Sequence, residues 1–138
     1  MPGYSGTPLP KKLGIKSGFR VALLRTPDDV RAKLRDALAD CTTVKVASGA
    51  LDFVLLFAKS RAELERELTP AARSLAPAGM LWISWPKKSS GVSSDLDENI
   101  VRETGLHAGL VDIKVCAVTD VWSGLKFVIR LKDRAKRR

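Results

Sequence analysis

Residues 79–96, GMLWISWPKKSSGVSSDL, decide the fold class of this 138-residue chain. An apolar run over residues 80–85 predicts a buried strand, and Pro86 follows it. A lysine- and serine-rich loop comes next, and residues 95–107 have the apolar spacing of a helix. In an open α/β sheet, ligands bind in the crevice outside the carboxyl ends of the strands. The loop therefore holds four candidate ligand-binding residues: Lys87, Lys88, Ser89 and Ser90.

Strand and helix patterns alternate along the rest of the chain. Apolar runs predict further strands at residues 19–24, 43–47, 51–58, 110–118 and 125–131. After the first of these, Thr26 is the predicted N-cap of a helix with Pro27 at its first position. After the third, Ser60 and Glu63 form a capping-box pattern that opens a second helix.

Proline and glycine give three further signals. Pro70 lies inside the second helical pattern, where it is expected to kink or split the helix, with Thr69 able to cap the second piece. Residues 77–79, Pro-Ala-Gly, are predicted to turn the chain into the strand at 80–85. Ser123 and Gly124 are predicted to form the tight turn between the last two strands.

This order of elements predicts the fold class. Strands that alternate with helices imply right-handed crossovers and a largely parallel sheet, and the last two strands form an antiparallel hairpin. The prediction is a single Rossmann-like α/β domain with a mostly parallel sheet of about six strands. We expect an extended N-terminal arm at residues 1–18, the α/β domain at 19–131 and a basic tail at 132–138.

The same order resembles a reduced, Rossmann-like methyltransferase fold. The stretch LAPAGMLWI (75–83) is similar to the turn and strand in the second half of that fold. The resemblance implies that the last strand inserts beside the strand at 80–85 and that the strand at 110–118 lies at the edge of the sheet.

A working methyltransferase of this type holds its cofactor at a glycine-rich loop after the first strand. Here residues 24–29 are LRTPDD: there is no glycine, Pro27 lacks a backbone donor, and two carboxylates stand where an anion would bind. Ala47-Ser48-Gly49 stands where an acid would hold a ribose. We therefore expect a degenerate methyltransferase-like scaffold without S-adenosylmethionine, dinucleotide or other cofactor.

Basic residues converge on one predicted edge of the sheet. The carboxyl ends of parallel strands lie together, and the N-terminal arm could fold over that edge. Such a cluster of cations and hydroxyls suits phosphate, carboxylate or a nucleic-acid backbone. The candidate ligand-binding residues are Arg25, Lys59, Ser60, Lys87, Lys88, Ser89 and Ser90 from the strand ends, with Tyr4, Thr7 and Lys11 from the arm.

The net charge of +9 is concentrated at the two ends of the chain. Residues 1–20 hold four cations and no acid, and the body at 21–131 is nearly neutral. Basic ends attract nucleic acid without sequence specificity, although they can equally serve solubility. Candidate contacts for a nucleic acid or another partner are Lys132, Arg134, Lys136, Arg137, Arg138 and Trp122.

Other chemistries lack their signatures. Cys41 and Cys116 are single and distant, so neither a disulfide framework nor a CxxC motif is indicated. His107, the single histidine, is interpreted as a helix C-terminal residue, and no metal site is expected. No phosphate-binding GxxxxGK[ST] motif occurs. The longest apolar run, residues 53–58, is too short to cross a membrane, so we expect a cytoplasmic protein.

Three segments together resemble an uncharacterised family of small bacterial proteins, described only as a domain of unknown function. They are YSGTPLPKKLGIKSG (4–18), LWISWPKKSSGVSSDL (81–96) and GLVDIKVCAVTDVWSGLKFVIR (109–130). The resemblance implies a stand-alone cytoplasmic bacterial domain and carries no catalytic residues. The end KDRAKRR lies outside these segments.

The sequence thus favours a non-catalytic binding or regulatory domain for an anionic ligand or partner. Two alternatives stay open. One is a small transferase acting on a phosphorylated or nucleotide-bearing substrate, and the other is an accessory nucleic-acid binder that uses its basic ends. The oligomeric state is not predicted.

Overall fold

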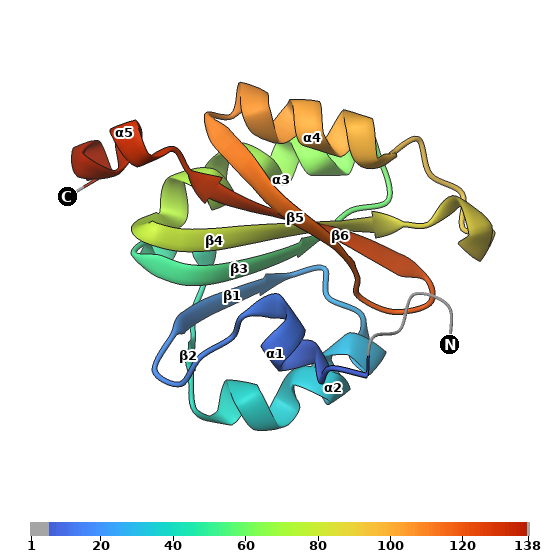
Figure 1. Ribbon diagram of the computed structural model, residues 1–138, viewed down its shortest axis with the longest axis horizontal. Coiled ribbons are helices and arrows are strands. Elements are labelled where there is room, and N and C mark those ends of the chain that lie inside the picture. The colour runs from blue at the N-terminus through green and yellow to red at the C-terminus, as the bar shows by residue number, and fades with distance from the viewer. Residues whose placement is uncertain (1–5, 138) are drawn as a thin grey trace.

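A six-stranded mixed sheet forms the centre of the molecule (Figure 1). The structure is a computed structural model that describes residues 6–137. The strand order is β2-β1-β3-β4-β6-β5, in which the first four strands are parallel and β6 runs antiparallel to both its neighbours. The strands are β1 (Arg20–Leu24), β2 (Thr42–Thr43), β3 (Leu51–Phe57), β4 (Leu75–Pro86), β5 (Leu110–Ala117) and β6 (Trp122–Ile129).

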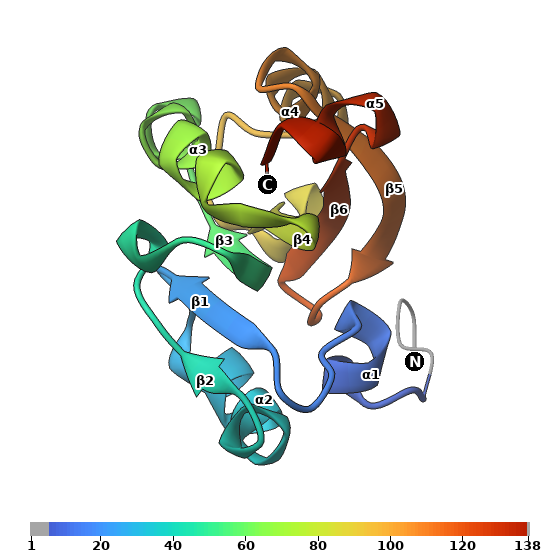
Figure 2. The same ribbon diagram turned by 90° about the vertical axis from the view of Figure 1, so that its left-hand side faces the viewer.

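This sheet confirms the predicted fold class. It is mostly parallel with a C-terminal antiparallel hairpin, and β6 lies between β4 and the edge strand β5, as the resemblance to methyltransferases implied. Helices cover both faces of this sheet (Figures 1 and 2). On one face lie α1 (Leu9–Leu13) and α2 (Asp28–Ala39), and on the other α3 (Arg61–Ser74) and α4 (Glu98–His107). The short α5 (Leu131–Arg134) follows β6.

The two faces of the sheet carry separate hydrophobic clusters. Because successive strand residues point to opposite faces, Leu81 and Ile83 of β4 pack toward α3 and α4, whereas Trp82 packs toward α1 and α2. All three side chains are fully buried. Burial on both faces explains the long apolar runs of β3 and β4, since a half-exposed strand would alternate apolar and polar residues.

The N-terminal segment is helical at residues 9–13, and the expected extended conformation is wrong there. Leu9 and Leu13 lie one turn apart, so both bury the same face of α1 against the sheet. Gly14 ends the helix in the left-handed region, at φ 86°. The indole N–H of Trp82 donates a 2.8 Å hydrogen bond to the carbonyl of Leu13, which fixes this helix end on the sheet.

The bounds of helix α2 and strand β2 differ from the predicted ones. Helix α2 begins at Asp28 with Pro27 as its N-cap residue, and the Thr26 side chain is buried without capping the helix. Strand β2 is shorter than predicted because only Thr42 and Thr43 pair with β1 before the chain enters a 3₁₀ turn at Val46–Ser48.

Proline and glycine positions account for three further corrections. Helix α3 continues unbroken through the exposed Pro70, so Thr69 caps no second helix. Residues 77–79 lie within β4, where a side chain on Gly79 would collide with the carbonyl oxygen of Leu51. Ser123 and Gly124 lie within β6, and the turn is made by residues 118–121.

Candidate functional site

A pocket of about 530 Å³ opens at the carboxyl ends of β1 and β3. These strands are neighbours, but the chain leaves β1 toward β2 on one side and leaves β3 toward β4 on the other. This is a topological switch point, where open α/β sheets bind their ligands. The lining residues are Arg25, Pro27, Phe57, Ala58, Lys59, Glu63, Val92, Val121 and Trp122.

Arg25, the residue after β1, has a backbone conformation that favours glycine. Its φ is 57°, a left-handed backbone that costs a residue with a side chain roughly 1 kcal/mol or more. Its guanidinium lies 3.2 Å from Glu63 and 3.7 Å from Glu67, both on α3. The charge of Arg25 is therefore balanced by two carboxylates of the protein itself.

The start of α3 forms another part of the pocket lining. The hydroxyl of Ser60 accepts a 3.1 Å hydrogen bond from the backbone N–H of Glu63, which confirms half of the capping box. The Glu63 carboxylate accepts its return bond, at 2.7 Å, from the backbone N–H of Lys59 rather than that of Ser60. The Lys59 ammonium takes part in none of the ion pairs within residues 6–137.

Apolar side chains form the rest of the pocket. The rings of Phe57 and Trp122 meet edge to face, with centroids 4.9 Å apart and an interplanar angle of 82°. Trp122 is only 8% exposed, so it belongs to the pocket wall and the core rather than to the outer surface. Val92 and Val121 come from the loops after β4 and β5. Of these apolar residues only Trp122 was a sequence-based candidate, and then as a contact for a partner; Phe57, Val92 and Val121 were missed because they come from three separate segments.

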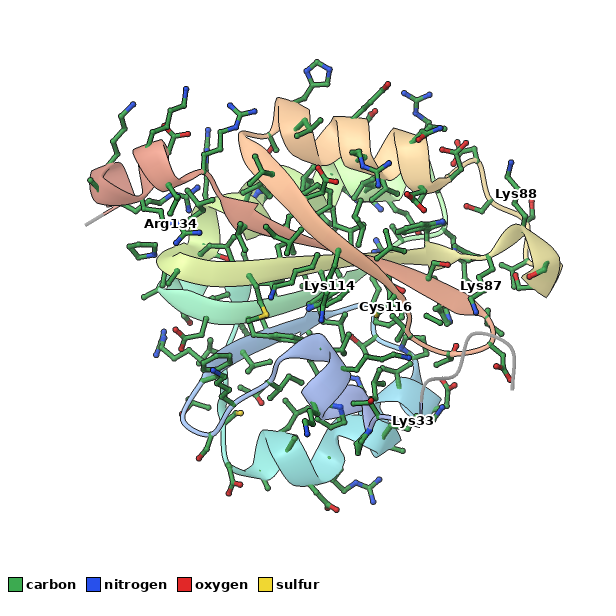
Figure 3. The ribbon with its side chains drawn as sticks, in the orientation of Figure 1. Lys33, Lys87, Lys88, Lys114, Cys116 and Arg134 are labelled. Carbon is green, nitrogen blue, oxygen red and sulfur yellow. The ribbon has the colours of Figure 1, made fainter. Side chains whose placement is uncertain are left out.

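The loop after β4 contributes less than predicted. Lys87 and Lys88 do not line the pocket, and in Figure 3 they project to opposite sides of the loop. The backbone N–H of Lys87 donates to the carbonyl of Val121 at 2.8 Å, and the hydroxyl of Ser90 donates to the carbonyl of Lys87 at 2.6 Å. Ser89 is exposed on the 3₁₀ turn Lys88–Ser90. The predicted convergence therefore holds for Arg25 and Lys59 alone.

The candidate residues of the N-terminal arm lie away from this pocket. Thr7 lines a smaller pocket of about 250 Å³, together with residues of α1 and Lys33 of α2. Lys11 is exposed on α1, and Tyr4 lies outside the described residues.

The basic C-terminal segment is partly used within the fold. The Arg134 guanidinium donates to the carbonyl of Ile129 at 3.0 Å. That of Arg137 donates to the carbonyls of Ala72, at 2.7 Å, and Leu75, at 3.1 Å, at the end of α3. Lys132 and Lys136 are exposed, and Arg138 lies outside the described residues.

Other polar groups have structural roles or stand apart. His107 lines a different groove of about 450 Å³, between α3 and α4. Asp97 caps α4 by accepting a 2.8 Å hydrogen bond from the N–H of Ile100. Within residues 6–137, no group of three or more His, Cys, Asp or Glu side chains could hold a metal ion. In the same part of the chain, none of the helices has the length and apolar character needed to cross a membrane.

The family model described as "Protein of unknown function (DUF3052)" matches residues 10–131. The chain belongs to the DUF3052 family. This family confirms the resemblance carried by the three sequence segments. No curated protein sequence matches this DUF3052 chain.

Solved structures similar to the DUF3052 chain include several methyltransferases. A precorrin-6y C5,15-methyltransferase from Geobacter metallireducens is 12% identical with a TM-score of 0.54, over 88% of this chain and 85% of that one. A ribosomal protein L11 methylase from Lactobacillus delbrueckii subsp. bulgaricus is 12% identical with a TM-score of 0.55, over 88% of this chain and 74% of that one. CalO1, a methyltransferase in calicheamicin biosynthesis solved with SAH, is 12% identical with a TM-score of 0.61, over 88% and 52%. At this identity the likeness shows the fold alone.

The residues at the end of β1 do not fit S-adenosylmethionine in the usual place of this fold. Arg25 occupies the left-handed position that a glycine would take, and its side chain is paired with α3. The first turn of α2 presents Asp28 and Asp29 in place of an anion-binding helix end. Strand β2 ends at Thr43 and is followed by Val44 and Lys45, without an acid for a ribose. No methyl-transfer chemistry is assigned to this pocket.

Proposed function

We propose that this protein is a non-catalytic binding domain whose ligand is a small organic anion, bearing phosphate or carboxylate, held in the pocket at the carboxyl ends of β1 and β3. The observation that carries the proposal is the position of Lys59, a cation without an acidic partner among residues 6–137, beside an apolar wall at the switch point of the sheet. A ligand with an apolar or planar body and one anionic group matches both parts.

The size and the lining of the pocket support a small molecule. Its volume of about 530 Å³ lies within the roughly 300–1,000 Å³ of small-molecule sites. Phe57 and Trp122 are largely buried and line the pocket, and Lys59 offers the charge that orients the ligand. Specific sites commonly combine such a wall with a few placed polar groups.

Hydrogen bonding at Glu63 supports binding over catalysis. One oxygen of this carboxylate accepts the backbone N–H of Lys59 at 2.7 Å, and the other accepts the guanidinium of Arg25 at 3.2 Å. A general base must be able to take a proton from the ligand. A carboxylate engaged on both oxygens serves better as a fixed support for Arg25 and Lys59.

A thermal-shift experiment tests the proposal. The probes are inorganic phosphate, citrate, adenosine 5′-monophosphate and S-adenosylmethionine. A ligand at about ten times its Kd stabilises by about 1.4 kcal/mol, which raises Tm by roughly 4–6 °C for a domain of this size. We expect one of the first three probes to raise Tm in the native protein and in Lys88→Ala, and to lose this effect in Lys59→Ala.

Lys88→Ala is the matched control because it removes the same charge from an exposed loop residue outside the pocket. An equal rise in Lys59→Ala, or no rise with any anion, contradicts the proposal. A rise with S-adenosylmethionine alone would instead favour the transferase alternative that the fold raises.

A further inference from the structure

Lysines gather on the sheet face of the β5–β6 hairpin beside α1. Lys114 of β5 and Lys126 of β6 stand directly opposite each other in the strand pairing. Lys16 lies just beyond α1, close enough to Lys126 to affect its ionisation. We call Lys16, Lys114 and Lys126 the lysine face. Figure 3 shows Lys114 and Cys116 on this hairpin at the front of the molecule.

The strand register places like charges where they repel. Side chains directly opposite across an antiparallel pair are close neighbours, and like charges there are destabilising. The Lys114 ammonium lies 6.0 Å from the centroid of the Trp82 ring, which gives it a partial, uncharged support. None of the ion pairs within residues 6–137 includes a member of the lysine face.

The segments that build this face are almost free of acids. Residues 6–19, β4 and β6 contain no Asp or Glu, and β5 contains only Asp112. Asp112 pairs with Phe127 in the register and lies on the opposite face, where its carboxylate is 2.9 Å from Arg102 of α4. No acid of these segments neutralises the lysine face.

The pKa of Lys126 is shifted in the direction expected for closely spaced lysines. Burial, with the nearby charges of Lys114 and Lys16, lowers the pKa of Lys126 below its ordinary value. The charged form of Lys126 is therefore less stable than that of an ordinary lysine, and a bound anion would offset that cost.

The composition of the face selects the class of partner. Protein interfaces are enriched in aromatic residues and arginine and depleted in lysine, and this face has the reverse composition. Single-stranded nucleic acids bind through bases stacked on exposed aromatic rings. No Phe or Trp side chain within residues 6–137 is exposed, and the exposed imidazole of His107 lies at the end of α4, away from this face. The lysine face therefore matches a partner with regularly spaced phosphates, which lysines contact without base stacking.

We propose that the lysine face of the β5–β6 hairpin docks on the phosphate backbone of a double-stranded nucleic acid, without reading its sequence. This surface is distinct from the pocket at the ends of β1 and β3 and from the basic C-terminal segment. Lys12 of α1 adds a further cation beside the hairpin. Its ammonium donates to the carbonyl of Ala117 of β5 at 2.8 Å.

Fluorescence anisotropy with a labelled DNA duplex of about 20 base pairs, in roughly 0.1 M salt, tests this proposal. The variant Lys114→Gln/Lys126→Gln should weaken binding about tenfold or more and reduce the slope of log K against log salt by about 1.8. The control Lys132→Gln/Lys136→Gln removes the same charge from exposed C-terminal residues and should weaken binding less than about twofold. Lys114→Arg/Lys126→Arg, which keeps both charges, should bind as the native protein does.

Removal of the opposed charges should leave Tm unchanged or raised, so a loss of binding is not a loss of folding. Equal weakening by the two glutamine variants would overturn the proposal, because net charge alone would then explain the binding. Tighter binding to the separated single strand, or binding to polyglutamate but not to the duplex, would also overturn it. So would the absence of duplex binding.

Discussion

Replacement of Trp82 with alanine is expected to lower the free energy of unfolding by about 4 kcal/mol. The ring is fully buried between β4 and α1, and large-to-small changes of aromatic residues in a core cost roughly 3–5 kcal/mol. The substitution also removes the hydrogen bond to the Leu13 carbonyl. Urea denaturation followed by circular dichroism measures the loss.

Trp82→Phe is the matched control for this prediction. Phenylalanine keeps most of the apolar volume but loses the hydrogen bond, so we expect a loss of about 1–2 kcal/mol. Both variants should speed hydrogen exchange of the α1 amides, because Trp82 fixes the end of that helix. A loss below about 1 kcal/mol in Trp82→Ala would show that the ring does not anchor α1 to the sheet.

Gly105→Ala is expected to destabilise the protein by about 2 kcal/mol, which reverses the ordinary effect of this substitution. Alanine in place of glycine inside a helix normally stabilises by roughly 0.5–1 kcal/mol. Gly105 lies in the buried face of α4, and an added Cβ would collide with the ring of Phe127 on β6. Helix α4 or the ring must then move within a close-packed core.

The double variant Gly105→Ala/Phe127→Leu separates the two effects. A smaller side chain at position 127 makes room for the added methyl group, so the double variant should be more stable than the sum of the two single changes predicts. Thermal unfolding of all four proteins measures this coupling. Simple additivity would contradict the close contact between Gly105 and Phe127.

The fold class followed from the sequence because apolar periodicity reflects burial directly. The apolar runs at residues 51–58 and 80–85 belong to strands that are buried on both faces. The apolar residues at helical spacing belong to helices that bury only one face. Two glycines that were predicted to form turns instead allow close packing inside strands. Gly79 and Gly124 resemble turn signals, but each lies inside a strand: Gly79 passes close to β3, and Gly124 packs against the side chains of Val118 and Trp82.

Part of the candidate site could be predicted because the order of strands along the chain places their carboxyl ends together. Arg25 and Lys59 follow the ends of two neighbouring parallel strands, so the chain order alone brings them to one edge of the sheet. Lys87 also follows a strand, but its backbone N–H donates to the carbonyl of Val121 and the residue does not line the pocket. The pairing of Lys114 with Lys126 depends on a register shift between Asp112 and Lys114, which alternation of residues along the strand does not reveal.

The indole N–H signals of the three tryptophans in a nitrogen-15 NMR titration test the central claim most directly. Trp122 lines the pocket beside Lys59, whereas Trp82 and Trp85 are buried in the two hydrophobic clusters. The titrants are inorganic phosphate and adenosine 5′-monophosphate, and Trp122→Phe assigns the signal. A saturable shift of the Trp122 signal, with the other two unmoved and the response lost in Lys59→Ala, is the predicted result. A titration that leaves Trp122 unmoved, or that moves Trp82 or Trp85 instead, would contradict an anion-binding pocket at the ends of β1 and β3.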